Sequence, residues 1–157
     1  SRLELPEAAR AAKVAAFMAT VEQPWPKPEV KMWRLGTSPA QAKLEEGRRW
    51  TRDKEFLTAI AAFDEAIGLD RELASAYSGR GYARMLAGDS MRARADFMTA
   101  LAKNADKKFQ AAVWFNLGGL AVQANNTAAA RTAYRKSQAL RDTTQVKDAL
   151  AALDAPK

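Results

Sequence analysis

The sequence predicts an all-α solenoid, in which three helix–turn–helix units stack between an N-terminal helix and a C-terminal capping helix. In the 34 residues from Ala74 to Lys107, the order of small, aromatic and turn-forming residues predicts a helix, a tight turn and a second helix. The same template recurs 34 residues upstream and 37 residues downstream. Repetition at this period is typical of stacked helical repeats. The residues that carry the template are Gly47, Trp50, Ala59, Phe63 and Ala66; Tyr77, Gly81, Ala93, Phe97 and Ala100; and Trp114, Gly118, Ala130 and Tyr134.

Residues 1–39 lie outside the repeats and are predicted to form a helix followed by an extended strap. The stretch from Pro6 to Val21 is amphipathic, and Pro24, Pro26 and Pro28 then exclude a helix. The apolar side chains of the strap either seal an end or flank of the stack or dock onto another subunit. These side chains are Trp25, Met32, Trp33 and Leu35.

The three repeats are predicted at 40–73, 74–107 and 111–144, and the capping helix with its tail at 145–157. Within the repeats we expect helices at about 40–53, 56–69, 73–87, 90–104, 108–124 and 127–140. The capping helix is expected because the last repeat of an open stack would otherwise leave an apolar face in water. Thr143 and Thr144 can cap its first turn.

The turns inside the second and third pairs are predicted at Gly88-Asp89 and Asn125-Asn126. Glycine and asparagine tolerate positive φ, and aspartate or asparagine can cap the following helix. The first pair turns at 53–55 without a glycine. The three additional residues near 107–110 are expected to add a turn at the start of the next helix.

A glycine stands in the middle of the first helix of each pair, at Gly47, Gly81 and Gly118. Each costs about 1 kcal/mol of helix propensity relative to alanine, so a packing gain must compensate. We expect the missing Cβ to let the two helices of a pair approach closely. Aromatic residues of the second helices are expected to fill the space between successive pairs: Phe63, Phe97 and Tyr134.

The composition fits a soluble single domain with an extension. The 157 residues are 48% hydrophobic and 27% charged, and no run approaches the roughly 20 apolar residues that cross a bilayer. A net charge of +7 favours anionic partners without saying whether they are protein, lipid or nucleic acid. The chain begins at Ser1 and not at a methionine, which is compatible with a processed periplasmic or organellar protein or a trimmed chain, so the compartment stays open.

Cysteine and histidine are both absent from the sequence. Disulfides, thiolate nucleophiles, the commonest general base near neutral pH and the commonest metal ligands are therefore excluded. We expect no enzymatic activity, no metal and no cofactor, since no acid, base and nucleophile set can be assembled. Nucleic-acid binding is not expected either, because the arginine clusters are not interleaved with aromatic residues as in a recognisable module.

From about Pro39 to Thr144 the chain resembles an array of three tetratricopeptide repeats. It carries the glycine and aromatic pairs of that family's first helix, such as Gly47 with Trp50, and the alanine, aromatic, alanine spacing of the second helix. The resemblance implies a right-handed superhelix whose first helices line a concave groove for peptides or partner helices. The chain departs from the family's usual leucine, aromatic or alanine at Glu46, Arg80, Arg84 and Ser137.

Correspondence with the family places a set of side chains on this groove. Tyr82 and Phe115 would offer apolar contact there, while Arg48 and Arg52 could pair with a carboxylate. Alternatively, Tyr82 and Phe115 pack against the chain's own N-terminal helix. The full set is Leu44, Arg48, Thr51, Arg52, Ser78, Tyr82, Met85, Phe115, Asn116, Gly119 and Val122.

The best known subclass of the family binds chaperone C-terminal carboxylates with lysine, asparagine and basic side chains. The matching places in this chain lack that set, so tight binding of such tails is not expected. These places hold Leu44, Arg48, Gly79, Ala112 and Asn116.

The sequence as a whole favours a non-enzymatic adaptor or assembly factor. Its partner would be a protein or peptide, and an acidic one would suit the arginines. The alternative is a permanent structural subunit of a larger complex, anchored by the strap.

Overall fold

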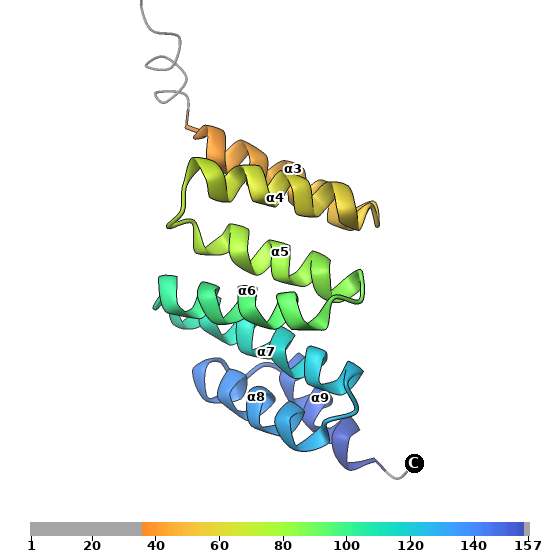
Figure 1. Ribbon diagram of the computed structural model, residues 1–157. Helices are drawn as coiled ribbons and strands as arrows, with labels where there is room; N and C mark the ends of the chain where they lie inside the picture. The colour runs from red at the N-terminus through yellow and green to blue at the C-terminus, as the bar shows by residue number, and fades with distance from the viewer. Residues whose placement is uncertain (1–35, 156–157) are drawn as a thin grey trace, which may run out of the picture. The chain divides into compact units, whose positions relative to one another are not determined.

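The computed structural model describes residues 36–155, and between them all regular structure is helical. The predicted helix from Pro6 to Val21 and the strap residues Trp25, Met32, Trp33 and Leu35 lie outside the described residues. The helices, labelled as in Figure 1, are α3 (Pro39–Arg52), α4 (Phe56–Leu69), α5 (Ala74–Leu86), α6 (Ser90–Lys103), α7 (Lys107–Gln123), α8 (Thr127–Leu140) and α9 (Thr144–Asp154).

The six described helices from α3 to α8 form three pairs, α3 with α4, α5 with α6 and α7 with α8, and α9 packs against α8. Figure 1 shows the pairs following one another along a single stack. The predicted all-α solenoid is confirmed, and the bounds of the six repeat helices agree with prediction to within one residue. The additional residues after α6 do lengthen the next helix, because α7 has 17 residues whereas α5 has 13.

Each pair is closed by a turn with one residue in the left-handed region. This residue is Lys54 (φ 63°), Gly88 (φ 88°) or Asn125 (φ 56°), so the two predicted turns are confirmed and the first pair uses a lysine. The next residue donates its backbone N–H to the carbonyl five positions earlier, which satisfies an otherwise unpaired group at the helix end. These bonds join Glu55 to Trp50, Asp89 to Arg84 and Asn126 to Ala121, each at 2.9 Å.

Side-chain caps begin four of the helices. Asp89, Asp106, Asn126 and Thr143 each accept a hydrogen bond from the backbone N–H three residues later. The predicted cap by Thr143 is therefore confirmed, and it starts α9 so that Val146 is fully buried against Ala130 and Tyr134. The last repeat is thus covered, as a stack end requires.

Glycine notches hold aromatic rings between the helices. A Cβ on Gly47 would lie 2.7 Å from the ring of Phe63, and one on Gly79 would lie 2.6 Å from the same ring. Phe63 is 1% exposed and fills the space between α3 and α5, in successive pairs, as predicted. Gly47 therefore makes room for a ring and not for the backbone of its partner helix, and Gly118 does the same for the ring of Tyr134, which corrects the expectation of close helix approach for these two glycines. At Gly81 the expectation is confirmed, because a Cβ there would lie 3.1 Å from the backbone oxygen of Ala93 in the partner helix.

A buried carboxylate explains two departures from the repeat pattern. Asp96 of α6 is 4% exposed, and its two oxygens accept hydrogen bonds from Arg80 (2.7 and 3.0 Å) and Arg84 (2.7 Å) of α5. Arg80 also pairs with Asp64 of α4 at 2.7 Å. Burial alone would lower the pKa of Arg80, but its hydrogen bonds to Asp96 and Asp64 outweigh burial and raise the pKa above its ordinary value. The pair of arginines thus joins three helices across the first two repeats.

The third departure, Ser137, is explained by a hydrogen bond across the third pair. Ser137 is 4% exposed, and its hydroxyl donates to the backbone carbonyl of Ala111 at 2.8 Å. A buried hydroxyl with a partner avoids the desolvation cost of an unpaired one. The bond fixes α8 against the start of α7, where the extra helical turn lies.

The notch predicts opposite effects for two glycine substitutions. Gly79→Ala should lower the free energy of unfolding by about 1–3 kcal/mol, because the new methyl group collides with the buried ring of Phe63. Gly68→Ala should raise it by up to about 1 kcal/mol, because Gly68 is helical and its Cβ would meet open space. Urea denaturation followed by circular dichroism measures both. Equal effects of the two substitutions would contradict the claim that Gly79 makes room for the ring of Phe63.

The carboxylate network predicts unequal effects for its two acids. Asp96→Ala should cost about 3–5 kcal/mol of unfolding free energy, since it leaves two partly buried guanidinium groups without their shared partner. Asp64→Ala should cost no more than about 1 kcal/mol, because its side chain is 51% exposed to solvent. Denaturant titration of the two variants decides this, and a similar small loss in both would show that the network does not hold the repeats together.

Candidate partner-binding groove

The first helices of the three pairs line two adjoining cavities of about 380 and 520 Å³. The smaller cavity runs from α3 across α5 to α7, and the larger one runs from α5 across α7 to the segment around α9. Tyr82, Ala112 and Asn116 line both, so the two cavities form one groove. We call it the inner groove.

Aromatic and aliphatic side chains form the middle of the inner groove. Tyr82 is 39% exposed, and Met85 and Phe115 line the larger cavity beside it. The ring of Phe115 also packs against Tyr134, with centroids 5.3 Å apart, so Phe115 is held in place from behind. An exposed tyrosine next to a supported phenylalanine gives a rigid apolar surface with a polar tip, which suits contact with a peptide.

Positive charge surrounds this apolar middle. Arg48 and Arg52 line the α3 end, and Lys108 and Arg141 line the α9 end. The described residues that line the two cavities include no aspartate or glutamate. Arg48 does pair with Glu45 at 2.7 Å, but that contact is solvent-exposed and Glu45 lies outside the cavity lining. The groove therefore presents a positive field to a partner.

Most of the residues predicted for the groove line one of the two cavities. They are Arg48, Thr51, Arg52, Ser78, Tyr82, Met85, Phe115, Asn116 and Gly119. Leu44 is a correction, because it is 1% exposed and packs in the core with Phe63, so it cannot contact a partner. Val122 is 44% exposed but belongs to neither lining. Contact of any of these residues with a partner remains a prediction.

Sequence reasoning missed the charged α9 end of the groove. Lys108 lies one helical turn before Ala112, on the face of α7 that the prediction followed, so extending that face backwards would have found it. Arg141, Thr143 and Gln145 carry no comparable signal. Their position depends on how α9 docks on α8, which repeat correspondence does not define.

The places of the chaperone-tail clamp are occupied by small or buried side chains. Gly79 and Ala112 line the smaller cavity without offering a side-chain donor, and Leu44 is in the core. Arg48 and Asn116 alone remain as polar groups at those places in the described groove.

Residues 36–155 contain neither a cluster of metal ligands nor a helix that could span a membrane. No group of three or more carboxylates there could hold a metal ion. None of the helices in this range combines the length and the apolar character that a bilayer crossing requires.

These features define a helical-repeat domain with a cationic and aromatic inner groove. No protein-family model and no curated protein matches the sequence. Solved structures do match the fold. The first tetratricopeptide domain of Spaghetti (RPAP3), bound to the HSP90 peptide SRMEEVD, superposes with a TM-score of 0.66 at 16% identity and covers 73% of this chain and 90% of that one.

Two other structures give the same result. The type III secretion chaperone SycD of Yersinia enterocolitica, in complex with a peptide of the translocator YopD, has a TM-score of 0.66 at 14% identity over 76% of this chain and 95% of that one. The Sgt2 tetratricopeptide domain of Aspergillus fumigatus has a TM-score of 0.66 at 20% identity over 75% and 79%. The chain therefore has the tetratricopeptide repeat fold, as its sequence pattern predicted.

Proposed function

We propose that this protein is a non-enzymatic interaction scaffold that binds an extended segment or helix of a partner protein in the inner groove. The observation that supports this proposal most strongly is the composition of the groove. An aromatic middle, with Tyr82 and Phe115, lies between two cationic ends and has no carboxylate among its described lining residues.

The groove favours a partner segment with apolar side chains in the middle and carboxylates towards its ends. Tyr82, Met85 and Phe115 would bury the apolar part. Arg52 at one end and Arg141 at the other would form charge-assisted hydrogen bonds with the carboxylates. The net charge of +7 would also speed the approach of an acidic partner.

The comparisons support a peptide ligand without naming one. Two of the structures with this fold were solved with a peptide bound, from HSP90 in one case and from YopD in the other. A domain of the same architecture with an open groove is suited to the same kind of ligand. The identity of the ligand has to come from the groove's own side chains, because the sequence identities of 14% and 16% transfer only the fold.

The aromatic middle of the groove gives the first functional prediction. A double variant, Tyr82→Ala with Phe115→Ala, should abolish recovery of the partner in affinity purification from the source cells, because the apolar contact surface is lost. Leu57→Ala with Leu69→Ala is the matched control, since these side chains are 80% and 58% exposed and lie outside the groove. Circular dichroism checks that both variants stay helical. Unchanged recovery with the groove variant would count against this binding site.

The absent clamp gives a second functional prediction. The peptide SRMEEVD should not bind this protein with low-micromolar affinity, because Gly79 and Ala112 supply no donors for its terminal carboxylate. Isothermal titration, with the Spaghetti domain as the positive control, measures this. Low-micromolar binding that Arg48→Ala abolishes would show that the chain has a working carboxylate clamp after all.

A further inference from the structure

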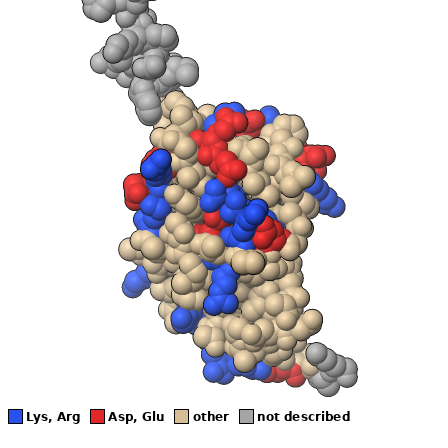
Figure 2. Space-filling model, viewed as in Figure 1, with Lys and Arg blue, Asp and Glu red and all other residues tan. Residues whose placement is uncertain are grey.

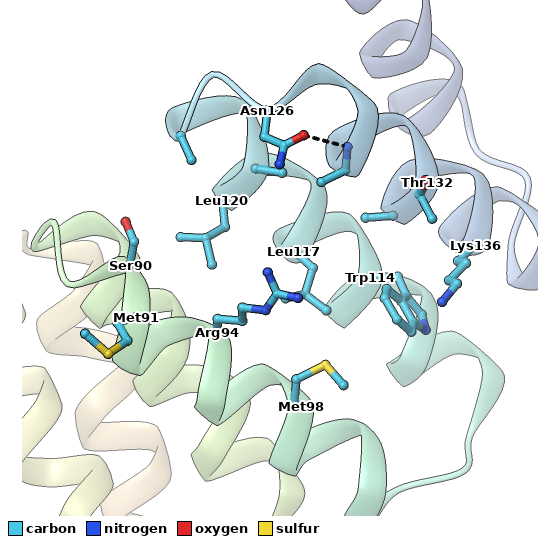
Figure 3. Close-up of a pocket in the computed structure, with 14 residues that line it drawn as sticks. Ser90, Met91, Arg94, Met98, Trp114, Leu117, Leu120, Asn126, Thr132 and Lys136 are labelled. Atoms are coloured by element: carbon cyan, nitrogen blue, oxygen red, sulfur yellow. Dashed lines mark hydrogen bonds between the residues drawn. The ribbon is translucent and has the colours of Figure 1, made fainter.

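A second hollow lies on the opposite side of α7 from the inner groove. It has a volume of about 550 Å³ and is bounded by α6, α7 and α8. Figure 3 shows Leu117 and Leu120 of α7 at its base, with Met98 and Arg94 reaching in from α6 and Trp114 beside Lys136. We call this hollow the outer groove. It shares no lining residue with the inner groove, so it is a separate surface.

Comparison of the repeats shows why this hollow is open. One repeat earlier, the corresponding positions hold the network of Asp64, Arg80, Arg84 and Asp96, whose side chains fill the space between α4, α5 and α6. The four corresponding residues between the second and third repeats are all apolar and two of them are alanines, so they cannot form such a network. With the repeat shifts of 34 and 37 residues, they are Met98, Leu117, Ala121 and Ala133.

The surface reflects this difference. Figure 2 shows side chains of both charges gathered at the level of α4 to α6, and a broad uncharged area at the level of α6 to α8. Met91 is 84% exposed and Met98 is 49% exposed at the edge of the outer groove. Methionines adapt their shape to varied apolar partners and are frequent on binding surfaces. Contiguous exposed apolar surface rimmed by polar side chains marks interaction sites in soluble proteins.

The charges at the edge indicate what kind of segment fits. Arg94 of α6 and Lys136 of α8 line the groove from opposite sides, and no aspartate or glutamate is among its described lining residues. The ammonium group of Lys136 lies 4.2 Å from the centroid of the Trp114 ring, which holds it over the groove. Within residues 36–155 neither cation has a carboxylate within ion-pair distance. Two cations without counter-charges complement an acidic ligand.

We infer that the outer groove binds an amphipathic helix of a partner protein, with its apolar side chains on Met91 and Met98, which are exposed above the buried Leu117 and Leu120, and its carboxylates on Arg94 and Lys136. Helices recognised in this way place an apolar face in a groove and charged side chains at its rim. A second copy of this chain is a poorer match, since its net charge is +7. The inference does not depend on the function proposed for the inner groove.

The test uses the full chain and a designed probe, a fluorescein-labelled amphipathic helical peptide with leucine on one face and glutamate on the flanks. Fluorescence polarisation should show saturable binding. A counterpart peptide with lysine in place of glutamate should bind at least about tenfold more weakly, because Arg94 and Lys136 would repel it. No binding of the glutamate peptide, or equal binding of both, would overturn the inference.

Three variants locate the binding. A double variant, Arg94→Glu with Lys136→Glu, should weaken the affinity for the glutamate peptide by about tenfold or more. Arg92→Glu with Arg135→Glu is the matched control, because it makes the same charge change at residues outside the groove lining and should have a much smaller effect. Ala121→Phe should block the groove without any change of charge. Circular dichroism and thermal unfolding confirm that each variant is folded.

Two results would assign the peptide elsewhere and so overturn the inference. In the first, the Tyr82→Ala, Phe115→Ala variant loses binding while the Arg94→Glu, Lys136→Glu variant binds fully. This result would place the peptide in the inner groove. The second is self-association of the unmodified chain that Ala121→Phe abolishes, measured by sedimentation velocity, which would make a second copy the occupant. Retained binding in the inner-groove variant supports the outer groove.

Discussion

An aromatic ring in a glycine notch determines how the first two repeats of this protein pack against each other. The ring of Phe63 leaves α4 and lies where a Cβ of Gly47 in α3 or of Gly79 in α5 would stand. A single side chain thus sets the spacing between the first helices of two repeats. The same arrangement shapes the inner groove, because Phe63 and Gly79 both line its smaller cavity. The contact of the Phe63 ring with the two glycines therefore determines both the packing of the first two repeats and the shape of the inner groove.

Polar packing joins the first two repeats in a second way. Asp96 is almost fully buried, yet three hydrogen bonds from Arg80 and Arg84 satisfy its oxygens, so the cost of burying the charge is offset. The next repeat has the same helix arrangement with Leu117 and Ala133 at the corresponding places. The backbone plan is shared, but one junction is filled by ion pairs and the other is left as an apolar hollow. A repeat fold can in this way carry different surfaces at equivalent positions.

The helices, the turns and the capping helix could be predicted because their signals are local. Gly88 and Asn125 permit positive φ by their own chemistry, and Thr143 reaches a backbone N–H only three residues away. The contacts of Asp96 span 12 and 16 residues and depend on two helices lying side by side, so no local pattern shows them. Leu44 was placed on the groove by family correspondence, whereas the crossing of α3 with α4 turns it into the core.

The acidic side chains are distributed so that the two grooves keep their positive charge. Asp64 and Asp96 are used between the first two repeats, Glu72 pairs with Lys103, and Asp154 pairs with Arg131. All of these pairs lie away from the linings of the two grooves. Cations therefore line both grooves with no aspartate or glutamate among the described lining residues: Arg48, Arg52, Lys108 and Arg141 in the inner groove, and Arg94 and Lys136 in the outer groove. Because a charge next to a desolvated apolar contact acts through a lower effective dielectric than an isolated surface charge, a few such cations discriminate strongly between acidic and basic segments. The proposed preference for acidic segments therefore rests on the absence of carboxylates from the described groove linings as much as on the aromatic residues that are present.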